Sequence, residues 1–200
     1  MCIRDRADIT CYCIIELAEE IDGRARDLAL DMQQHSPSRY ELVFKDDTDV
    51  CGEYVHQYSS TTAALLWNSL RMIRIHANEI IVSQLSPSQP RLVANCCLLK
   101  SMPDATIAKM CLEICASIPE AVRLNKGNDL TDHVAAVNFL IWPLFKVGSS
   151  MSTSASVREY ALSQLEELGQ RYHVQKALIA AEQLKTGQYD EKWMHVTHMF

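Results

Sequence analysis

Apolar residues recur at the spacing of an α-helix along most of this chain, and the pattern is most regular between Ala63 and Val82. One face of the helix expected there carries five apolar residues: Leu66, Leu70, Ile73, Ala77 and Ile80. Another face carries Asn68, Arg71 and Asn78. A helix with this pattern is usually a core helix whose polar stripe faces solvent. We therefore expect the apolar face to be buried, and the polar residues to require partners if they are not solvated.

The same periodicity predicts helices in several further segments. They cover residues 7–34, 104–118, 133–146, 156–168 and 173–185, with 91–101 as a further candidate. Glycine is a poor helix former, so Gly23 marks a weak point or break in the first of them. The segment 40–60 has little periodicity and is the longest expected loop.

The ends of these helices are expected at residues that commonly cap or stop a helix. The signals are Asp104 as an N-cap, Pro119 as a stop, Thr131 or Asp132 as an N-cap, a bend or end at Pro143, a capping box from Ser156 to Glu159, and a stop at Gly187. Together they predict an all-α fold, an irregular multi-helix domain of about six to eight helices, spanning residues 7–186 and followed by a tail over 187–200.

Composition agrees with this fold. The chain has 200 residues, 48% of them hydrophobic and 22% charged, which is ordinary for a globular domain with its own core. Six glycines and six prolines leave little material for a turn-rich β fold. The longest apolar stretch, Val134 to Phe145, is short of the ~20 residues that span a bilayer, so we expect a soluble intracellular protein without membrane contact.

The charge balance argues against nucleic-acid binding. The net charge is -6, and the Lys and Arg residues are scattered beside Asp or Glu instead of forming a basic patch. We therefore expect no direct nucleic-acid contact by this chain.

The eight cysteines do not have the spacing of a metal site. No C-x2-C pair occurs, and most cysteines lie in apolar helical runs, where a free thiol behaves as a small buried hydrophobe. Cys111 and Cys115 are expected in the core for this reason. His195 and His198 have helical spacing but no third ligand nearby. We expect free, reduced cysteines and no metal or other cofactor bound by this chain.

One acidic run leaves an enzymatic alternative open. Asp46, Asp47 and Asp49 are similar to the aspartate-rich magnesium motif of terpenoid synthases, but their spacing is D-D-x-D and they lie in the expected loop. No phosphate-binding loop, dinucleotide fingerprint, nucleophile elbow or H-E-x-x-H motif is present. With no catalytic residue to name, the sequence favours a protein that is not an enzyme.

Three segments, in this order, resemble the C-terminal part of fungal-specific transcription factor domains. They are W-N-S-L-R-M-I-R-I-x-x-N-E-I-I within 58–82, E-I-C-A-S-I-P over 113–119 and I-W-P-L-F-K-V-G over 141–148. The final helices fit as well, with Arg158, the L-E-E-L-G run ending at Gly169, and A-L-I from Ala177. In that family, the helical region follows an N-terminal zinc binuclear cluster, which requires six cysteines in a basic segment.

The resemblance implies a regulatory domain that does not itself bind DNA. Zinc is then expected only in an upstream cluster that this chain lacks, and Met1 to Arg6, which resembles a translated sequencing-adapter remnant, favours a domain truncated at its N-terminus. A nuclear location and partners among other transcription-regulatory proteins are implied, and a homodimer or a small-molecule effector is compatible with it. A free-standing helical adaptor is the remaining alternative.

The structural and regulatory candidates follow from both lines of reasoning. Arg71, Arg74 and Glu79 are expected to join their helix to its neighbours through buried or half-buried ion pairs. The expected core contains Trp67, Leu70, Ile73, Ile80, Ile114, Trp142 and Leu144. The complete set of candidate site residues is Trp67, Asn68, Arg71, Arg74, Asn78, Glu79 and Trp142.

Overall fold

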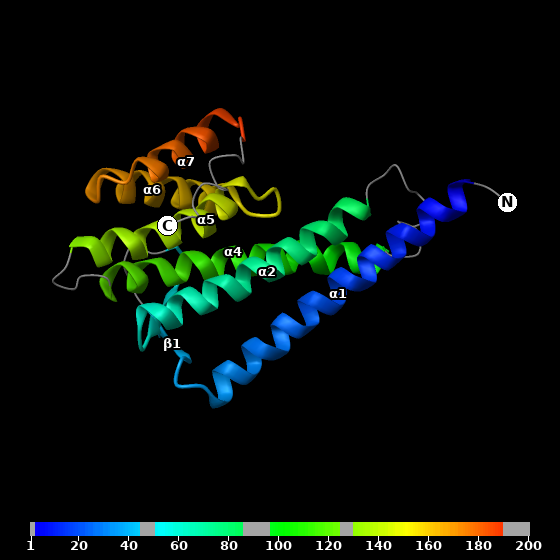
Figure 1. The fold of residues 1–200 in the computed structure, drawn as a ribbon, viewed down its shortest axis with the longest axis horizontal. Coiled ribbons are helices and arrows are strands. Elements are labelled where there is room, and N and C mark those ends of the chain that lie inside the picture. Colours follow the sequence, from blue (N-terminus) through cyan, green and yellow to red (C-terminus); the bar gives the residue numbers. More distant parts are fainter. Residues whose placement is uncertain (1–2, 45–50, 86–96, 125–129, 190–200) are drawn as a thin grey trace.

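The fold is formed by helices, with one small hairpin, in a computed structural model that describes residues 3–44, 51–85, 97–124 and 130–189 (Figure 1). Side chains are described for 11–44, 51–85, 102–124 and 137–189. The elements in these ranges are α1 (Ile3–His35), β1 (Tyr40–Phe44), β2 (Tyr54–Tyr58), α2 (Thr61–Gln84), α4 (Cys97–Leu124), α5 (Leu130–Ser149), α6 (Ala155–Arg171) and α7 (Gln175–Thr186). The predicted all-α fold of six to eight helices is confirmed, with six helices in the described residues.

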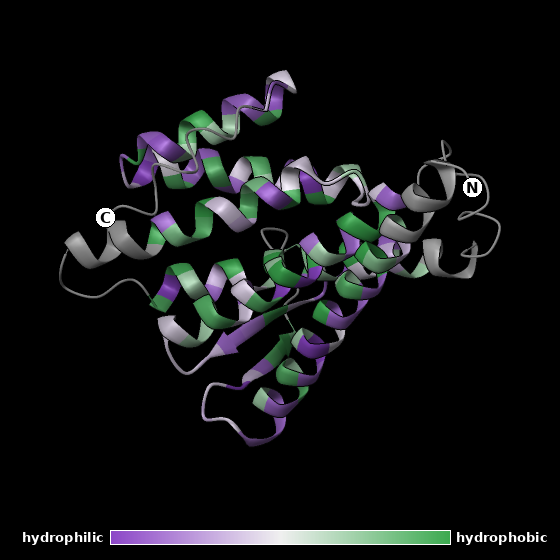
Figure 2. Cartoon of the chain, turned by 45° about the vertical axis from the view of Figure 1, so that its right-hand side comes forward, coloured by the Kyte–Doolittle hydropathy of each residue, from purple (hydrophilic) through white to green (hydrophobic). Residues whose placement is uncertain are grey.

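The long helix α2 lies between α1 and α4, and α5, α6 and α7 pack on the side of α4 away from α1 (Figure 1). Each helix has an apolar side and a polar side, which Figure 2 shows as alternating green and purple along the ribbons. The apolar sides of α2, α4, α5, α6 and α7 form one continuous core. Ile114, Leu144 and Leu165 lie within it, each fully buried. The hairpin closes one end of this core.

Helices α1 and α2 run antiparallel and meet along a narrow seam. Residues of α1 at alternating spacings of four and three are buried or half-buried: Cys11, Ile15, Ala18, Asp22, Ala25, Ala29 and Met32. This is the heptad pattern by which two helices pack side by side. Ile15 and Ala18 contact Ile81 and Leu85, near the far end of α2. Most of the other described side chains of α1 are exposed.

The break expected at Gly23 is wrong, because α1 continues through this residue. A glycine inside a helix costs only about 1 kcal/mol relative to alanine. The seam residues Asp22 and Ala25, on either side of Gly23, both pack against α2 and offset that cost.

The loop expected over 40–60 is also wrong, because β1 and β2 form an antiparallel hairpin there. Tyr40 pairs with Tyr58 and Val43 with Val55. Both strands are rich in the aromatic and β-branched residues that favour sheets. Helical periodicity carries no signal for such short strands. The acidic run Asp46 to Asp49 lies outside the described residues.

Pro119 and Pro143 do not end their helices, whereas α1 ends at His35, just before Pro37, as expected. Helix α4 continues through Pro103 and Pro119, and α5 continues through Pro143. Proline removes one helical hydrogen bond at a cost of about 3 kcal/mol, and the fully buried residues around it on α4, such as Ile107 and Ile118, offset that cost. Asp104 is therefore not an N-cap, and its carboxylate instead accepts a hydrogen bond of 2.7 Å from Ser152. Of the candidate helix 91–101, the last residues belong to α4, and 86–96 lie outside the described residues.

The remaining helix ends differ from prediction by a few residues. The N-cap of α6 is Ser154 instead of Ser156, and its hydroxyl accepts a hydrogen bond of 3.4 Å from the amide of Val157. Helix α5 begins at Leu130, before the expected caps, and 125–129 are outside the described residues. Helix α7 does end at Gly187, which has a φ of 67° in the left-handed region that favours glycine. Beyond it, the tail from residue 190 lies outside the described part.

Candidate functional site

The buried face of α2 differs in part from the one that its periodicity predicted, because Leu70 and Ala77 are buried but the rest of the predicted apolar face is exposed. Leu66, Ile73 and Ile80 are 47%, 43% and 43% exposed, so their placement in the core is wrong. Asn68, Arg71 and Asn78, which were expected either to be solvated or to have partners, are 2%, 2% and 4% exposed. The reason is that α2 is covered by α1 on one side and by α4 on another, and the polar residues find partners on both. Trp67 and Leu70 are buried as expected.

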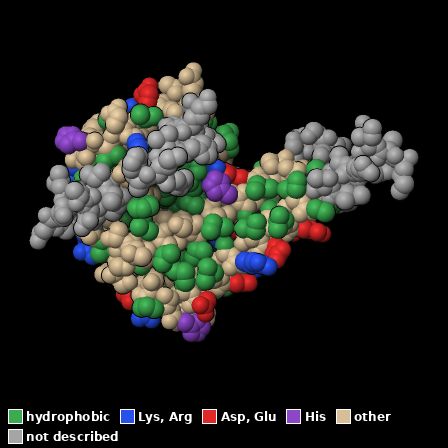
Figure 3. Space-filling view, in the orientation of Figure 1, with side chains coloured by type: hydrophobic (Ala, Val, Ile, Leu, Met, Phe, Trp, Pro, Cys, Tyr) green, Lys and Arg blue, Asp and Glu red, His purple; other side chains and the backbone are tan. Residues whose placement is uncertain are grey.

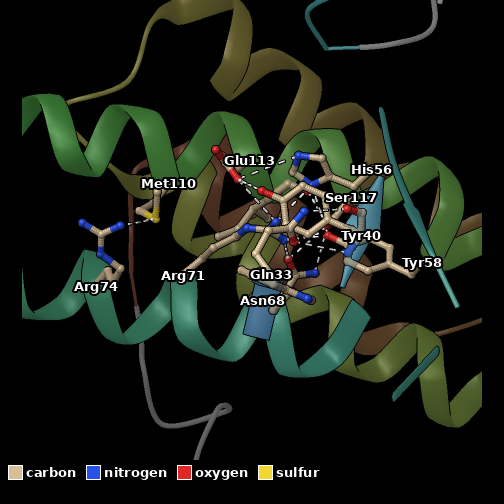
Figure 4. Close-up of polar contacts among 12 residues, drawn as sticks. Gln33, Tyr40, His56, Tyr58, Asn68, Arg71, Arg74, Met110, Glu113 and Ser117 are labelled. Carbon is tan, nitrogen blue, oxygen red and sulfur yellow. Dashed lines mark hydrogen bonds and ion pairs between the residues drawn. The ribbon is translucent and has the colours of Figure 1, made fainter. Parts of the chain in front are cut away.

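Arg71 lies at the middle of a cluster that we call the buried polar centre (Figure 4). Its Nη1 donates to the hydroxyl of Tyr58 at 2.8 Å and to Oδ1 of Asn68 at 2.9 Å. Its Nη2 lies 3.0 Å from Nδ1 of His56 and 3.4 Å from Oε2 of Glu113. The centre comprises Tyr40, His56, Tyr58, Asn68, Arg71, Glu113 and Ser117.

The charge of Arg71 is balanced within the centre. Burial opposes this charge, but the neighbouring Tyr58 and Glu113 outweigh it and raise the pKa of the guanidinium. The guanidinium carbon also lies over the ring of Tyr40, 5.4 Å from its centroid, and over the ring of Trp67, at 5.6 Å. Cation–π contacts of this kind are stronger when water is excluded. Arg71 is therefore a charged residue held in the protein interior.

Tyr40 connects the hairpin to the carboxylate of α4. Its hydroxyl donates to Oε2 of Glu113 at 3.3 Å. Burial, with the negative charge of Glu113, raises the pKa of Tyr40 to about 12. The phenol therefore stays protonated and keeps its donor role. Trp67 joins the same region to the turn after α1, through a hydrogen bond of 2.8 Å from Nε1 to the carbonyl oxygen of Ser38.

His56 is fully buried and uncharged. Burial, followed by the charge of Arg71, lowers the pKa of His56 to about 3. Its Nδ1 lies 3.0 Å from the guanidinium of Arg71, a donor, and 3.1 Å from the hydroxyl of Tyr58, so Nδ1 is the acceptor and Nε2 carries the hydrogen. Nε2 has no hydrogen-bond partner and lies 3.8 Å from Oε2 of Glu113. A neutral ring makes no ion pair with that carboxylate, and the contact is a weak one.

Asn68 fixes the other end of the centre to α4. Its Nδ2 donates to the hydroxyl of Ser117 at 2.9 Å, while Oδ1 accepts from Arg71. Ser117 in turn donates to the carbonyl oxygen of Ile114 at 2.6 Å. With both ends of its amide in use, Asn68 holds α2 and α4 at a fixed register.

Arg74 and Asn78 bind α1 through a single carboxylate. Nε and Nη2 of Arg74 lie 2.8 and 3.4 Å from the two oxygens of Asp22, and Nδ2 of Asn78 lies 2.9 Å from Oδ1. The side chains of Arg74 and Asp22 are 15% and 16% exposed. This two-pronged geometry is the strong form of the arginine–carboxylate pair.

Glu79 and Trp142 connect α2 to α5. The carboxylate of Glu79 forms an ion pair with Lys146, and the ring of His76 stacks on Trp142 with centroids 6.0 Å apart. Trp142 is half-buried at the edge of the core instead of inside it. Arg71, Arg74 and Glu79 thus each form the kind of interhelical ion pair that the sequence suggested, to α4, α1 and α5.

For the pairs of Arg71 and Arg74, the sequence identified the arginine but not its partner. It gave no partner for Arg71 or Arg74, because Glu113 and Asp22 look like ordinary polar residues of amphipathic helices. One signal was present: Glu113 and Ser117 lie four residues apart in an otherwise apolar run, so they share a helix face with Met110 and Ile114. The histidine of the hairpin had no sequence signal, because the hairpin itself was not expected.

The buried polar centre fits a structural role better than a catalytic one. Its donors and acceptors are used within the centre, with the exception of Nε2 of His56. Surface hollows lie elsewhere: one of about 650 Å³ between α4 and α6, lined by Pro119, Glu159 and Tyr160 among others, and one of about 450 Å³ along α7. Five of the seven residues of the centre are buried, and Tyr40 and Glu113 are half-buried.

The described ranges contain neither a metal-binding cluster nor a membrane-spanning helix. Among the described side chains, no three His, Cys, Asp or Glu residues lie close enough to hold a metal ion. His195 and His198 are outside these ranges. Cys11, Cys13, Cys51, Cys111 and Cys115 form no disulfide bond, and Cys111 and Cys115 are core residues as predicted. None of the described helices combines the length and the apolar character needed to cross a membrane.

Comparison with known proteins adds no assignment to this geometry. No protein-family model, no curated protein and no solved structure matches the chain.

Proposed function

We propose that this chain is the regulatory helical region of a fungal zinc-cluster-type transcription factor, which regulates transcription by RNA polymerase II through protein interaction or effector response. It would act without catalysis and without binding DNA itself. Zinc would belong to a cluster encoded upstream. The proposal places the protein in the nucleus, with other transcription-regulatory proteins as partners.

The observation that carries this proposal is that the three segments resembling the family contact one another. Arg71 of the first segment pairs with Glu113 of the second, and Asn68 of the first bonds to Ser117 of the second. Glu79 of the first pairs with Lys146 of the third. Residues that share a motif by resemblance alone would have no reason to meet in pairs. Their contacts support the interpretation that the three segments together carry one set of residues that joins the helices.

Two glycines from the resembling segments support the same interpretation. Gly148, at the end of the third segment, packs against the side chain of Leu184 in α7, and a Cβ added there would collide with it. Gly169, at the end of the L-E-E-L-G run, packs equally closely against Leu178. Both positions need glycine because two helices approach closely, which is a packing role.

A transcription assay tests this function directly. The chain is inserted between a heterologous DNA-binding domain and an activation domain in a fungal reporter strain. We expect reporter expression to change several-fold relative to a fusion that carries an inert helical domain of similar length. Arg71→Ala should abolish the change, while Arg171→Ala, at a residue of α6 whose side chain is 51% exposed, should preserve it.

Sequencing the gene upstream provides an independent test. An in-frame basic segment with C-x2-C-x6-C spacing is expected. A reporter that does not respond, together with an upstream sequence lacking such a segment, would contradict the proposal and favour the free-standing adaptor.

The terpenoid-synthase alternative rests on Asp46, Asp47 and Asp49, outside the described residues. If that alternative held, magnesium with inorganic diphosphate would raise the melting temperature, because a ligand that binds only the folded state stabilises it. We expect no shift. The matched control is the Asp46→Asn/Asp47→Asn variant under the same conditions.

A further inference from the structure

Helix α1 exposes a regular row of large apolar side chains. Ile14, Ile21 and Leu28 are spaced by seven residues, each directly before a seam residue that contacts α2. They are 37%, 41% and 50% exposed, and Leu17 beside them is 58% exposed. A row with heptad spacing that does not face α2 is unexplained by the packing of a single copy.

Helix α2 exposes a second row with the same spacing, Leu66, Ile73 and Ile80. In an antiparallel pair of helices, residues that come one position before the corresponding seam residue on each helix lie on the same side of the pair. Ile14, Ile21 and Leu28 have this position on α1, and Leu70 and Ala77 have it on α2. The exposed row of α2 lies next to Leu70 and Ala77. Helix α4 occupies the opposite side, where Asn68 bonds to Ser117.

The two rows therefore form one surface, which we call the outer face: Ile14, Leu17, Ile21, Leu28, Leu66, Ile73 and Ile80. Figure 3 shows hydrophobic side chains gathered over α1 and α2 in this region. Each row extends over about 20 Å, at 1.5 Å per residue. The outer face is thus two helices wide and as long as four turns.

The α2 half of the outer face carries no exposed charged side chain that would favour its contact with water. The exposed residues along α2 are Thr62, Leu66, Ser69, Ile73, Ile80 and Ser83. The charged residues of α2, Arg71, Arg74 and Glu79, all have partners on neighbouring helices. A contiguous apolar surface of several hundred Å² is unusual on a monomer and marks an interaction site.

The charge of the outer face fits a second copy of this chain. A two-fold interface must be self-complementary. Glu20 and Arg24, exposed at the border of the α1 row, carry opposite charges four residues apart, so antiparallel α1 helices place each opposite its counterpart.

We propose that this protein forms a two-fold symmetric homodimer through the outer face, with the α1–α2 pairs of two copies packed as a four-helix layer. The α5, α6 and α7 helices lie away from this interface and stay accessible in both copies.

Sedimentation equilibrium of the full chain tests the proposal. We expect a mass of twice 22.6 kDa at micromolar concentration. Ile21→Glu/Ile73→Glu should weaken the dimer roughly a hundredfold, because buried charges without partners are costly at an apolar interface. The matched control is Phe139→Glu, an exposed apolar residue of α5 at 61% exposure, which should leave the dimer intact.

Loss of the dimer in a variant can be distinguished from misfolding of that variant. Circular dichroism reports whether each variant keeps its helices, and Leu17→Glu/Leu66→Glu provides a second pair at more exposed positions. The proposal also predicts that Glu20→Arg weakens the dimer and that adding Arg24→Glu restores it. A monomeric wild-type chain at ~100 μM, or a dimer that persists in both folded double variants, would overturn the proposal.

Discussion

The guanidinium of Arg71 lies 3.4 Å from the carboxylate of Glu113, and this pair joins α2 to α4 with side chains that are 3% and 14% exposed. A charge in such a place is stable only while its counter-charge and hydrogen-bond partners are present. The pair therefore makes the fold sensitive to changes on either helix.

Removing one member of this pair should be strongly destabilising. Arg71→Ala leaves Glu113 partly buried without its counter-charge, and we expect the free energy of unfolding to fall by ~3–5 kcal/mol. Urea denaturation monitored by circular dichroism measures it. The double variant Arg71→Met/Glu113→Gln removes both charges and should cost less than Arg71→Ala alone. A double variant that is less stable than the single one would refute the role of the pair.

Arg74 should contribute less, because its pair with Asp22 is partly solvated. We expect Arg74→Ala to cost about 1–3 kcal/mol, since Asp22 also loses its two-pronged partner, and to lower the melting temperature by several degrees. Arg171→Ala is the control, because its exposed pair with Glu167 on α6 is worth little. If the two variants melt at the same temperature, the attachment of α1 does not depend on Arg74.

His56 should make stability depend on pH below neutrality. Its folded pKa of about 3 is lower than its unfolded value, near 6.5. Between these values the unfolded chain binds more protons, so stability rises with pH and is lost as pH falls through this window, by up to ~1.4 kcal/mol per pH unit. The range from pH 6.5 to 5 is the cleanest, since most carboxylates stay ionised there.

The measurement for His56 is the free energy of unfolding as a function of pH, compared with His56→Gln. This variant keeps an uncharged polar side chain, so its curve should be flatter over the same range. Equal slopes for the two proteins would mean that His56 is not buried and neutral.

Two glycines should respond in opposite directions to the same substitution. At Gly23 an added Cβ meets only Nη2 of Arg26 at 4.0 Å, so Gly23→Ala should stabilise the protein by about 0.4–1 kcal/mol. At Gly169 an added Cβ would lie 2.7 Å from Cγ of Leu178, so Gly169→Ala should destabilise by about 1–3 kcal/mol. Thermal unfolding of both variants checks this, and a stabilised Gly169→Ala would show that α6 and α7 are not packed as described.

Local sequence was sufficient for the helices and for the residues that need partners. Periodicity located each helix that the structure describes, and Gly187 ended α7 because only glycine readily adopts its left-handed conformation. Asn68, Arg71, Arg74 and Glu79 stood out because polar groups on an apolar helix must be paired if they are covered. These features depend on neighbours within a few residues, which the sequence states directly.

The tertiary structure decided which side of α2 is the inside. Both sides of this helix could be buried by local criteria, and the apolar row of Leu66, Ile73 and Ile80 looked like the better choice. The polar side was buried instead, because Asp22, Glu113 and Ser117 supply its hydrogen bonds from positions more than forty residues away in sequence. Likewise, the buried residues around Pro103 and Pro119 kept α4 continuous against a local signal. In each case, packing between distant segments outweighed a preference that only near neighbours could express.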